Sequence, residues 1–102
     1  MARKISELAC RAFYNREKFK LSNTEVTVSD NVVKLRLWGN TIAKISENEI
    51  WFTLAGWDTV TTFDRLRAVG VPLRKRNGYI YVGDKDRKIN SYDWYKLKDY
   101  GE

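Results

Sequence analysis

An Asn-Gly pair at residues 77 and 78 constrains the fold of this chain more than any other feature. It lies within the stretch LRKRNGYIYV, between two short segments suited to strands. Both central residues of a two-residue type I′ turn need positive φ, and Asn-Gly accepts that conformation readily. The sequence therefore predicts a β-hairpin with four cross-strand pairs: Arg76 with Tyr79, Lys75 with Ile80, Arg74 with Tyr81, and Leu73 with Val82.

The two faces of the predicted hairpin differ in chemistry because side chains alternate along each strand. One face is typical of a core surface and consists of Leu73, Ile80, Val82 and the stem of Lys75. The other face is basic and aromatic and consists of Arg74, Arg76, Tyr79 and Tyr81. The hairpin therefore predicts a surface with two guanidinium groups beside two phenol rings.

The remaining pattern predicts one α+β domain over residues 1–102. Apolar residues recur at helical spacing over residues 4–16, which favours an N-terminal helix. From residue 24 the period becomes two, with turns near residues 29–31, at Gly39-Asn40 and near residues 47–49. Ile42 and Ile45 are out of phase, which indicates a bulge. With the hairpin and a last strand over residues 92–97, we expect an antiparallel β-meander of about seven strands.

A short central helix is expected between the meander and the hairpin. Thr61 and Asp64 fit a capping box, with threonine at the N-cap and an acid three residues later. Leu66 and Val69 then face inward, and Gly70 ends the helix. Arg65 and Arg67 are expected on the exposed side of this helix.

The composition argues against several kinds of chemistry. The chain has one cysteine and no histidine, so an intramolecular disulfide, a cysteine-based zinc site and histidine-dependent nucleophiles are excluded. Cys10 has no accompanying base, and Asp84-Lys85-Asp86 lacks the glycine and the bidentate glutamate of a calcium loop. We expect no catalytic residues, no metal and no small-molecule cofactor. No apolar run approaches the roughly 20 residues that would span a bilayer, so no membrane partner is expected.

Positive charge is concentrated in two segments of the chain: residues 1–20 hold six Lys or Arg against two acids, which gives +4, and the second segment contains the hairpin. The formal net charge is +6, and residues 63–88 hold eight Lys or Arg against three acids, which gives +5. Clustered positive charge is typical of proteins that bind nucleic acid. Arginines can neutralise phosphates and tyrosines can stack on unpaired bases. The candidate DNA- or RNA-binding residues are Arg74, Arg76, Tyr79, Tyr81, Arg65 and Arg67.

Two structural interpretations of the same hairpin stay open. Arg–Tyr pairs across the strands stabilise an exposed hairpin by roughly 0.2–1 kcal/mol each, without any ligand. Alternatively, the tyrosines belong to the core and the basic stems lie around them. The Tyr, Trp and Arg residues also suit a protein–protein hot spot.

Two further stretches resemble a set of small, largely uncharacterised proteins of tailed bacteriophages. The first, a GN-x-IA step, consists of Gly39, Asn40, Ile42 and Ala43. The second, a GW-x-T-x-TT-x-x-RL step, consists of Gly56, Trp57, Thr59, Thr61, Thr62, Arg65 and Leu66. These residues also have structural explanations. Gly39-Asn40 suits a turn, the threonines suit a helix cap, and Trp57 is expected to be buried at the corner between sheet and helix. The resemblance implies a phage origin and the cytoplasm of an infected bacterium. As the alternative function, it implies an effector that binds and inhibits or redirects a host protein or a defence complex.

Overall fold

A computed structural model describes residues 4–83, 85 and 87–99 of the chain. These residues form two α-helices and nine strands. The helices are α1 (Lys4–Asn15) and α2 (Val60–Val69). The strands are β1 (Phe19–Leu21), β2 (Thr24–Ser29), β3 (Val32–Leu37), β4 (Asn40–Ser46), β5 (Glu49–Phe52), β6 (Leu73–Arg76), β7 (Tyr79–Val82), β8 (Arg87–Ile89) and β9 (Tyr95–Lys96). A short 3-10 helix, η1 (Leu97–Asp99), follows β9, and the predicted α+β class is confirmed.

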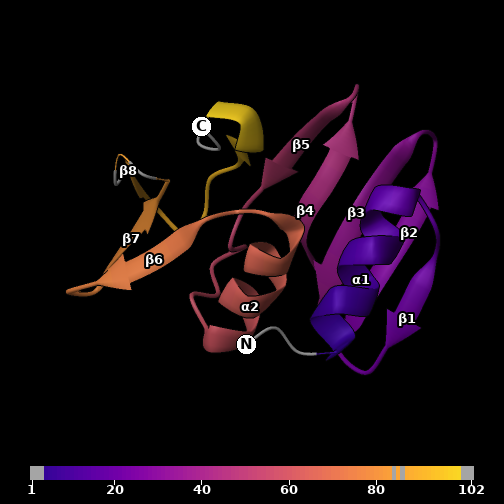
Figure 1. Cartoon of the computed structure of the whole chain (residues 1–102), viewed down its shortest axis with the longest axis horizontal. Helices are drawn as coiled ribbons and strands as arrows, with labels where there is room; N and C mark the ends of the chain where they lie inside the picture. The colour runs from indigo at the N-terminus through magenta and orange to yellow at the C-terminus, as the bar shows by residue number, and fades with distance from the viewer. Residues whose placement is uncertain (1–3, 84, 86, 100–102) are drawn as a thin grey trace.

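The strands form two antiparallel sheets rather than one meander. Within the described residues, one sheet has the order β1-β2-β3-β4-β5-β9 and the other has the order β6-β7-β8 (Figure 1). The short strands β1 and β8 lie outside the seven that the sequence pattern suggested. The last strand covers two residues rather than residues 92–97, because the Asn90 side chain holds the preceding loop in a turn. Its Oδ1 accepts hydrogen bonds from the Tyr92 and Asp93 amides, at 2.8 Å each.

Two-residue turns with positive φ at both residues connect β2 to β3, β3 to β4, β4 to β5 and β6 to β7. The φ values are 53° at Asn77 and 83° at Gly78, as a type I′ turn requires. The turn predicted at Gly39-Asn40 lies one residue earlier, at Trp38 (φ 51°) and Gly39 (φ 81°), because Asn40 already pairs with Leu37. The expected bulge is confirmed: Leu35 pairs with Ala43 and Arg36 with Thr41, so Ile42 is the extra residue.

Helix α2 begins two residues earlier than the capping-box pattern predicted. Thr59 is its N-cap, and the Thr59 Oγ1 accepts a hydrogen bond from the Thr62 amide at 3.2 Å. Gly70 ends the helix in the left-handed conformation, with φ of 117°. The predicted end of the helix is therefore confirmed, and the predicted N-cap at Thr61 is wrong.

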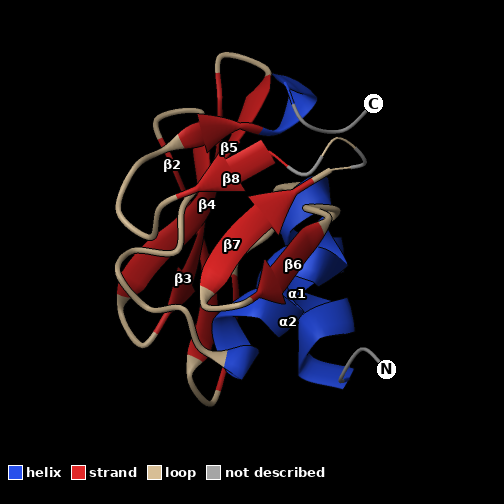
Figure 2. Cartoon of the chain, turned by 90° about the vertical axis from the view of Figure 1, so that its left-hand side faces the viewer, coloured by secondary structure: helices blue, strands red, loops and turns tan. Residues whose placement is uncertain are grey.

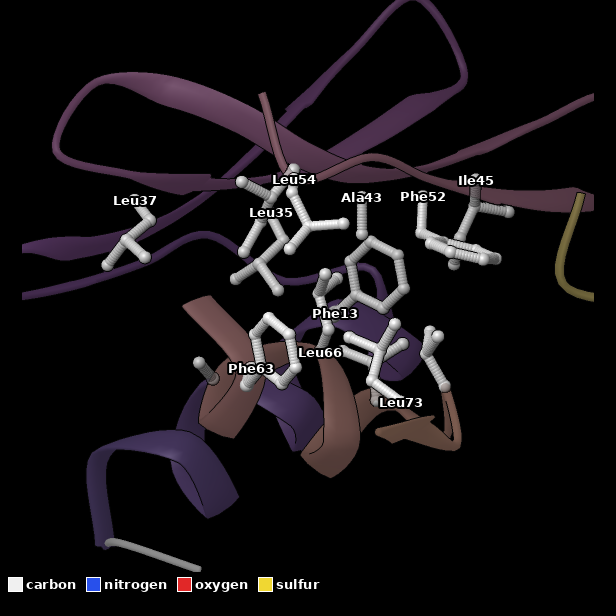
Figure 3. Packing of buried hydrophobic residues seen from close by; sticks show 14 of the residues in the cluster. Phe13, Leu35, Leu37, Ala43, Ile45, Phe52, Leu54, Phe63, Leu66 and Leu73 are labelled. Carbon is white, nitrogen blue, oxygen red and sulfur yellow. The ribbon is translucent and has the colours of Figure 1, made fainter. Parts of the chain in front are cut away.

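Both helices lie on one face of the six-stranded sheet (Figure 2). The hydrophobic core lies between the sheet and the helices. Phe13 of α1 and Leu66 of α2 point toward Leu35, Leu54 and Phe52 of the sheet side (Figure 3). All five side chains are at most 1% exposed. The predicted apolar stripe of α1 and the inward direction of Leu66 and Val69 are confirmed. The helices leave the opposite face of the six-stranded sheet uncovered (Figure 2).

Candidate nucleic-acid interface

Strands β6 and β7 form the predicted hairpin in the predicted register. Leu73 pairs with Val82, Arg74 with Tyr81, Lys75 with Ile80 and Arg76 with Tyr79. Strand β8 adds a third strand on the β7 side, where Lys88 pairs with Tyr81 and Ile89 with Ile80. Because side chains alternate, Lys88 shares a face with Arg74 and Tyr81.

We call this surface the hairpin face and define it as Arg74, Arg76, Tyr79, Tyr81 and Lys88. Tyr79 is 51% exposed and Tyr81 is half-buried, so the interpretation that placed the tyrosines in the core is wrong. The opposite side of the same strands meets the core, where Leu73, Ile80, Val82 and Ile89 are buried. The predicted division of the hairpin into an apolar face and a basic-aromatic face is confirmed.

Cations and rings contact each other across the hairpin face. The Arg76 guanidinium lies 4.9 Å from the ring centroid of Tyr81, and the Lys88 ammonium lies 3.8 Å from that of Tyr79. Arg74 donates a hydrogen bond to the Gly83 carbonyl, which anchors its side chain along the strand. Each contact between a cation and a ring is worth about 0.5–1 kcal/mol at an exposed site. The face thus presents three positive charges and two rings on one side of a small sheet.

Arg67 lies beside the start of the hairpin, as expected for an extension of the basic surface. Its side chain is exposed, and its Nε donates a hydrogen bond to the Leu73 carbonyl at 3.0 Å. Its guanidinium also lies 5.2 Å from the Phe63 ring. Arg67 and Arg74 line one shallow depression over residues 70–74, so the two cations are near neighbours.

Arg65, in contrast, is not a surface residue, and the prediction that it extends the basic patch is wrong. It is 3% exposed and lies under α1 and the start of β2. Its Nε donates to Thr24 Oγ1 at 2.9 Å, and its Nη1 donates to Ser6 Oγ at 2.8 Å and to Asp64 Oδ2 at 3.0 Å. A guanidinium has five donors, and this site uses them to join α1, α2 and β2. Arg65 therefore belongs to the scaffold.

Two tryptophans that lie far apart in the sequence form an exposed pair. Trp38 and Trp57 are each 50% exposed, and their ring centroids are 6.2 Å apart. Trp57 was expected at a buried corner, but it follows a turn at Ala55-Gly56 and lies at the surface. We call Trp38 and Trp57 the tryptophan pair. Positive φ at a residue as bulky as Trp38 is an uncommon, strained conformation.

The structure also gathers cations and rings from β3, β4, β5 and β9 on the uncovered face of the six-stranded sheet. Lys34 pairs with Lys44, Lys44 with Trp51, and Trp51 with Lys96. Trp94 lies beside this row, with the Lys44 ammonium 4.6 Å from its ring centroid. Closing the turn at residues 47 and 48 as a two-residue hairpin pairs Lys44 with Trp51, so the sequence did contain that signal. Nothing in the local pattern indicated that β9 returns to β5.

Burial raises the pKa of the Cys10 thiol, which lowers its thiolate fraction at neutral pH. No cluster of three or more potential metal ligands occurs within residues 4–83, 85 and 87–99. Asp84 and Asp86 of the calcium-like stretch lie outside the described residues. No helix in the described part of the chain is both long and apolar enough to cross a membrane.

The comparison with protein families covers almost the whole chain. The family model described as the Kyanoviridae Gp96 protein matches residues 2–100. No curated protein and no solved structure matches the chain. The expected origin in a family of phage proteins is confirmed. The chain belongs to the Kyanoviridae Gp96 family of bacteriophage proteins.

Proposed function

We propose that this phage protein binds nucleic acid without catalysis, in the cytoplasm of the infected bacterium, and that the hairpin face contacts single strands. One observation carries the proposal. Arg74, Arg76 and Lys88 share a sheet face with two tyrosine rings, while the apolar side chains of the opposite face, Leu73, Ile80, Val82 and Ile89, are buried in the core. The core therefore fixes which side of the hairpin meets solvent.

Each component of the hairpin face suits one part of a single strand. Lysine and arginine neutralise phosphates and release condensed counterions, which makes the affinity strongly dependent on salt. Aromatic rings stack on unpaired bases of any sequence, at about 1–3 kcal/mol per base. Tyr79 offers an exposed ring, and the Lys88 ammonium lies 3.8 Å from the centroid of that ring. A preference for single strands follows because bases in a duplex already stack on each other.

The test compares two variants that lose the same charge. Arg76→Gln with Lys88→Gln removes two cations from the hairpin face, and Lys4→Gln with Arg11→Gln removes two exposed cations from α1. For each protein, fluorescence anisotropy gives the affinity for an oligothymidine between about 50 and 200 mM salt. The log–log salt slope is expected to flatten by about 1.4 in the hairpin variant, since each single-strand phosphate contact contributes about 0.7.

The α1 variant is the matched control and is expected to keep most of the wild-type slope. Equal flattening in both variants would mean that total charge, rather than the hairpin face, governs binding. A wild-type protein that does not bind the oligonucleotide at about 50 mM salt contradicts the proposed function outright.

The tryptophan pair supports a second candidate, in which the protein is an effector that binds a host protein. Tryptophan is enriched at protein–protein hot spots. Trp38 also adopts a strained backbone conformation while remaining half exposed, and such strain often occurs at functional sites. A structural role alone leaves the exposure of two adjacent tryptophans unexplained.

Affinity capture from host lysate separates the two candidates. The bait is the wild-type protein or a variant with Trp38→Asn and Trp57→Ser, with and without nuclease treatment. Asparagine tolerates positive φ, so the turn is expected to survive the first substitution. A partner that survives nuclease and is lost with the tryptophan pair favours the effector. Capture that nuclease abolishes in both proteins favours nucleic acid.

A further inference from the structure

The uncovered face of the six-stranded sheet carries a continuous row of outward side chains. From β2 to β9 the directly paired residues are Thr27, Lys34, Lys44, Trp51 and Lys96. Strands are about 4.8 Å apart, so the part from Lys34 to Lys96 crosses roughly 14 Å of sheet. We call Lys34, Lys44, Trp51 and Lys96 the lysine row.

The lysine row places like charges where a sheet usually avoids them. Lys34 and Lys44 lie directly opposite each other on β3 and β4. Like charges at opposite positions destabilise a sheet, whereas opposite charges stabilise it. Fold stability alone therefore does not favour two lysines at these positions. An anionic ligand shared by both lysines removes the repulsion.

The carboxylates on the neighbouring rows of this face contact other cations. Glu25 lies 3.8 Å from Arg36, and Glu49 forms an ion pair of 2.9 Å with Lys98. Glu49 also attracts Lys96 electrostatically, so the β9 end of the row is partly compensated. The five strand cations on this face are Lys20, Lys34, Arg36, Lys44 and Lys96, against the two carboxylates of Glu25 and Glu49. The face as a whole keeps an excess of positive charge.

Tryptophan rings contact two of the three ammonium groups in the row. The Lys44 ammonium lies 4.6 Å from the Trp94 centroid and 6.0 Å from that of Trp51, and the Lys96 ammonium lies 5.2 Å from that of Trp51. These contacts already restrict the lysine side chains. Phosphate binding therefore costs less side-chain conformational entropy. Trp94 is itself 38% exposed and offers a ring for an unpaired base. The row thus combines phosphate and base recognition.

The loop at residues 90–94 connects the lysine row to the hairpin face. It joins β8 of the small sheet to β9 of the large sheet and carries Trp94. Besides the turn at Asn90, the Ser91 carbonyl accepts a hydrogen bond from the Gly56 amide at 2.7 Å. The Asn90 amide donates to the Tyr95 hydroxyl at 3.0 Å. These bonds fix the loop that carries Trp94, whose ring lies beside Lys44 of the six-stranded sheet.

We propose that the lysine row is a second contact surface for single-stranded nucleic acid, so that a strand long enough contacts both sheets. This inference rests on the proposed function, because the hairpin face supplies the first contact. Three lysines suit a row of phosphates, and Trp51 and Trp94 suit bases that are not paired. An acidic peptide offers the charge without the planar bases, so the exposed ring favours nucleic acid as the occupant.

The test uses oligothymidines of about 8 and about 20 nucleotides, a range that single-strand binding domains typically cover. The row variant carries Lys34→Gln, Lys44→Gln and Lys96→Gln. The control variant carries Lys4→Gln, Arg11→Gln and Arg16→Gln, which removes the same charge from the exposed side of α1 and the residue after it. Thermal melts show that each protein is folded. A milder variant carries only Lys34→Gln and Lys96→Gln. It keeps Lys44 and therefore the contact between Lys44 and Trp94.

We expect the row variant to lose at least about tenfold in affinity for the long oligonucleotide near 0.1 M salt, with a slope flatter by about 2. The milder variant is expected to flatten the slope by about 1.4. Affinity for the short oligonucleotide changes little in both variants, because the hairpin face still binds it. The control variant is expected to bind both oligonucleotides nearly as the wild type does.

Four results would overturn the inference. They differ in whether the proposed function of the hairpin face is still supported. Unchanged binding of the long oligonucleotide by the row variant, with weakened binding by the hairpin variant, removes the second surface and keeps the proposed function. Equal losses in the row and control variants reduce the effect to total charge. Polyglutamate that binds the row as tightly as the oligonucleotide contradicts the choice of nucleic acid. A wild-type protein that binds neither oligonucleotide overturns both proposals.

Discussion

Replacing Arg65 with alanine removes a guanidinium that joins three elements of the fold. The side chain is 3% exposed and donates to Thr24, Ser6 and Asp64 at 2.8–3.0 Å. Alanine leaves the Asp64 carboxylate without its cation and two hydroxyl groups without a donor. We therefore expect Arg65→Ala to reduce the free energy of unfolding far more than an ordinary surface substitution does.

The size of the loss follows from the burial of the two charges. Removing one partner of a buried ion pair typically costs about 3–5 kcal/mol. The Asp64 side chain is 17% exposed and keeps some hydration, which moves the expectation to the lower end, about 3 kcal/mol. Domains of this size are stable by about 5–15 kcal/mol, so the variant loses a large share of its stability.

Urea unfolding followed by circular dichroism measures this loss, with Arg67→Ala as the matched control on the same helix. Arg67 is exposed and makes one hydrogen bond and one ring contact, so its replacement is expected to cost about 1–2 kcal/mol, clearly less than the replacement of Arg65. Arg65→Lys is expected to recover little, because an ammonium cannot reproduce the planar set of donors. The reasoning fails if Arg65→Ala costs no more than Arg67→Ala.

Two further predictions concern single titratable groups. The hydrogen bond from Lys98 lowers the pKa of Glu49 in the folded protein. The pair therefore stabilises the fold fully at pH values above the unfolded pKa of this carboxyl. The stabilisation is lost as the pH falls through the folded pKa. The difference in unfolding free energy between wild type and Glu49→Gln should therefore shrink as the pH falls from neutral through the folded pKa of the carboxyl, and a difference that persists once the carboxyl is protonated contradicts the assignment. Burial raises the pKa of Cys10, so its reaction with a disulfide reagent at neutral pH should be slower than that of free glutathione. Reaction at the rate of glutathione would show that the thiol is not desolvated.

Local signals in the sequence predicted the elements that depend on neighbouring residues. Asn77-Gly78 determined the register of β6 and β7 because only a two-residue turn satisfies its φ preferences. The phase change at Ile42 predicted the bulge in β4 for a similar local reason. The hairpin face followed from alternation alone, and Lys88 was missed because β8 lies beyond the hairpin.

The errors arose where distant segments decide the environment of a residue. Thr62, Arg65, Leu66 and Val69 occupy one face of α2 at helical spacing, so periodicity already placed Arg65 on the buried side. Its charge argued for exposure, and its partners Thr24 and Ser6 lie 41 and 59 residues away in sequence. The split into two sheets likewise depends on β9 pairing with β5, which no local pattern indicates.

A chemical-shift map of the amide resonances tests the central claim most directly. Titration of isotope-labelled protein with a short oligothymidine reports which part of the chain the strand contacts. The account predicts that the largest shifts occur in β6, β7 and β8, around Tyr79, Tyr81 and Lys88, while α1 stays nearly unchanged. Shifts that are centred on the tryptophan pair or on α1, with β7 unaffected, would contradict it.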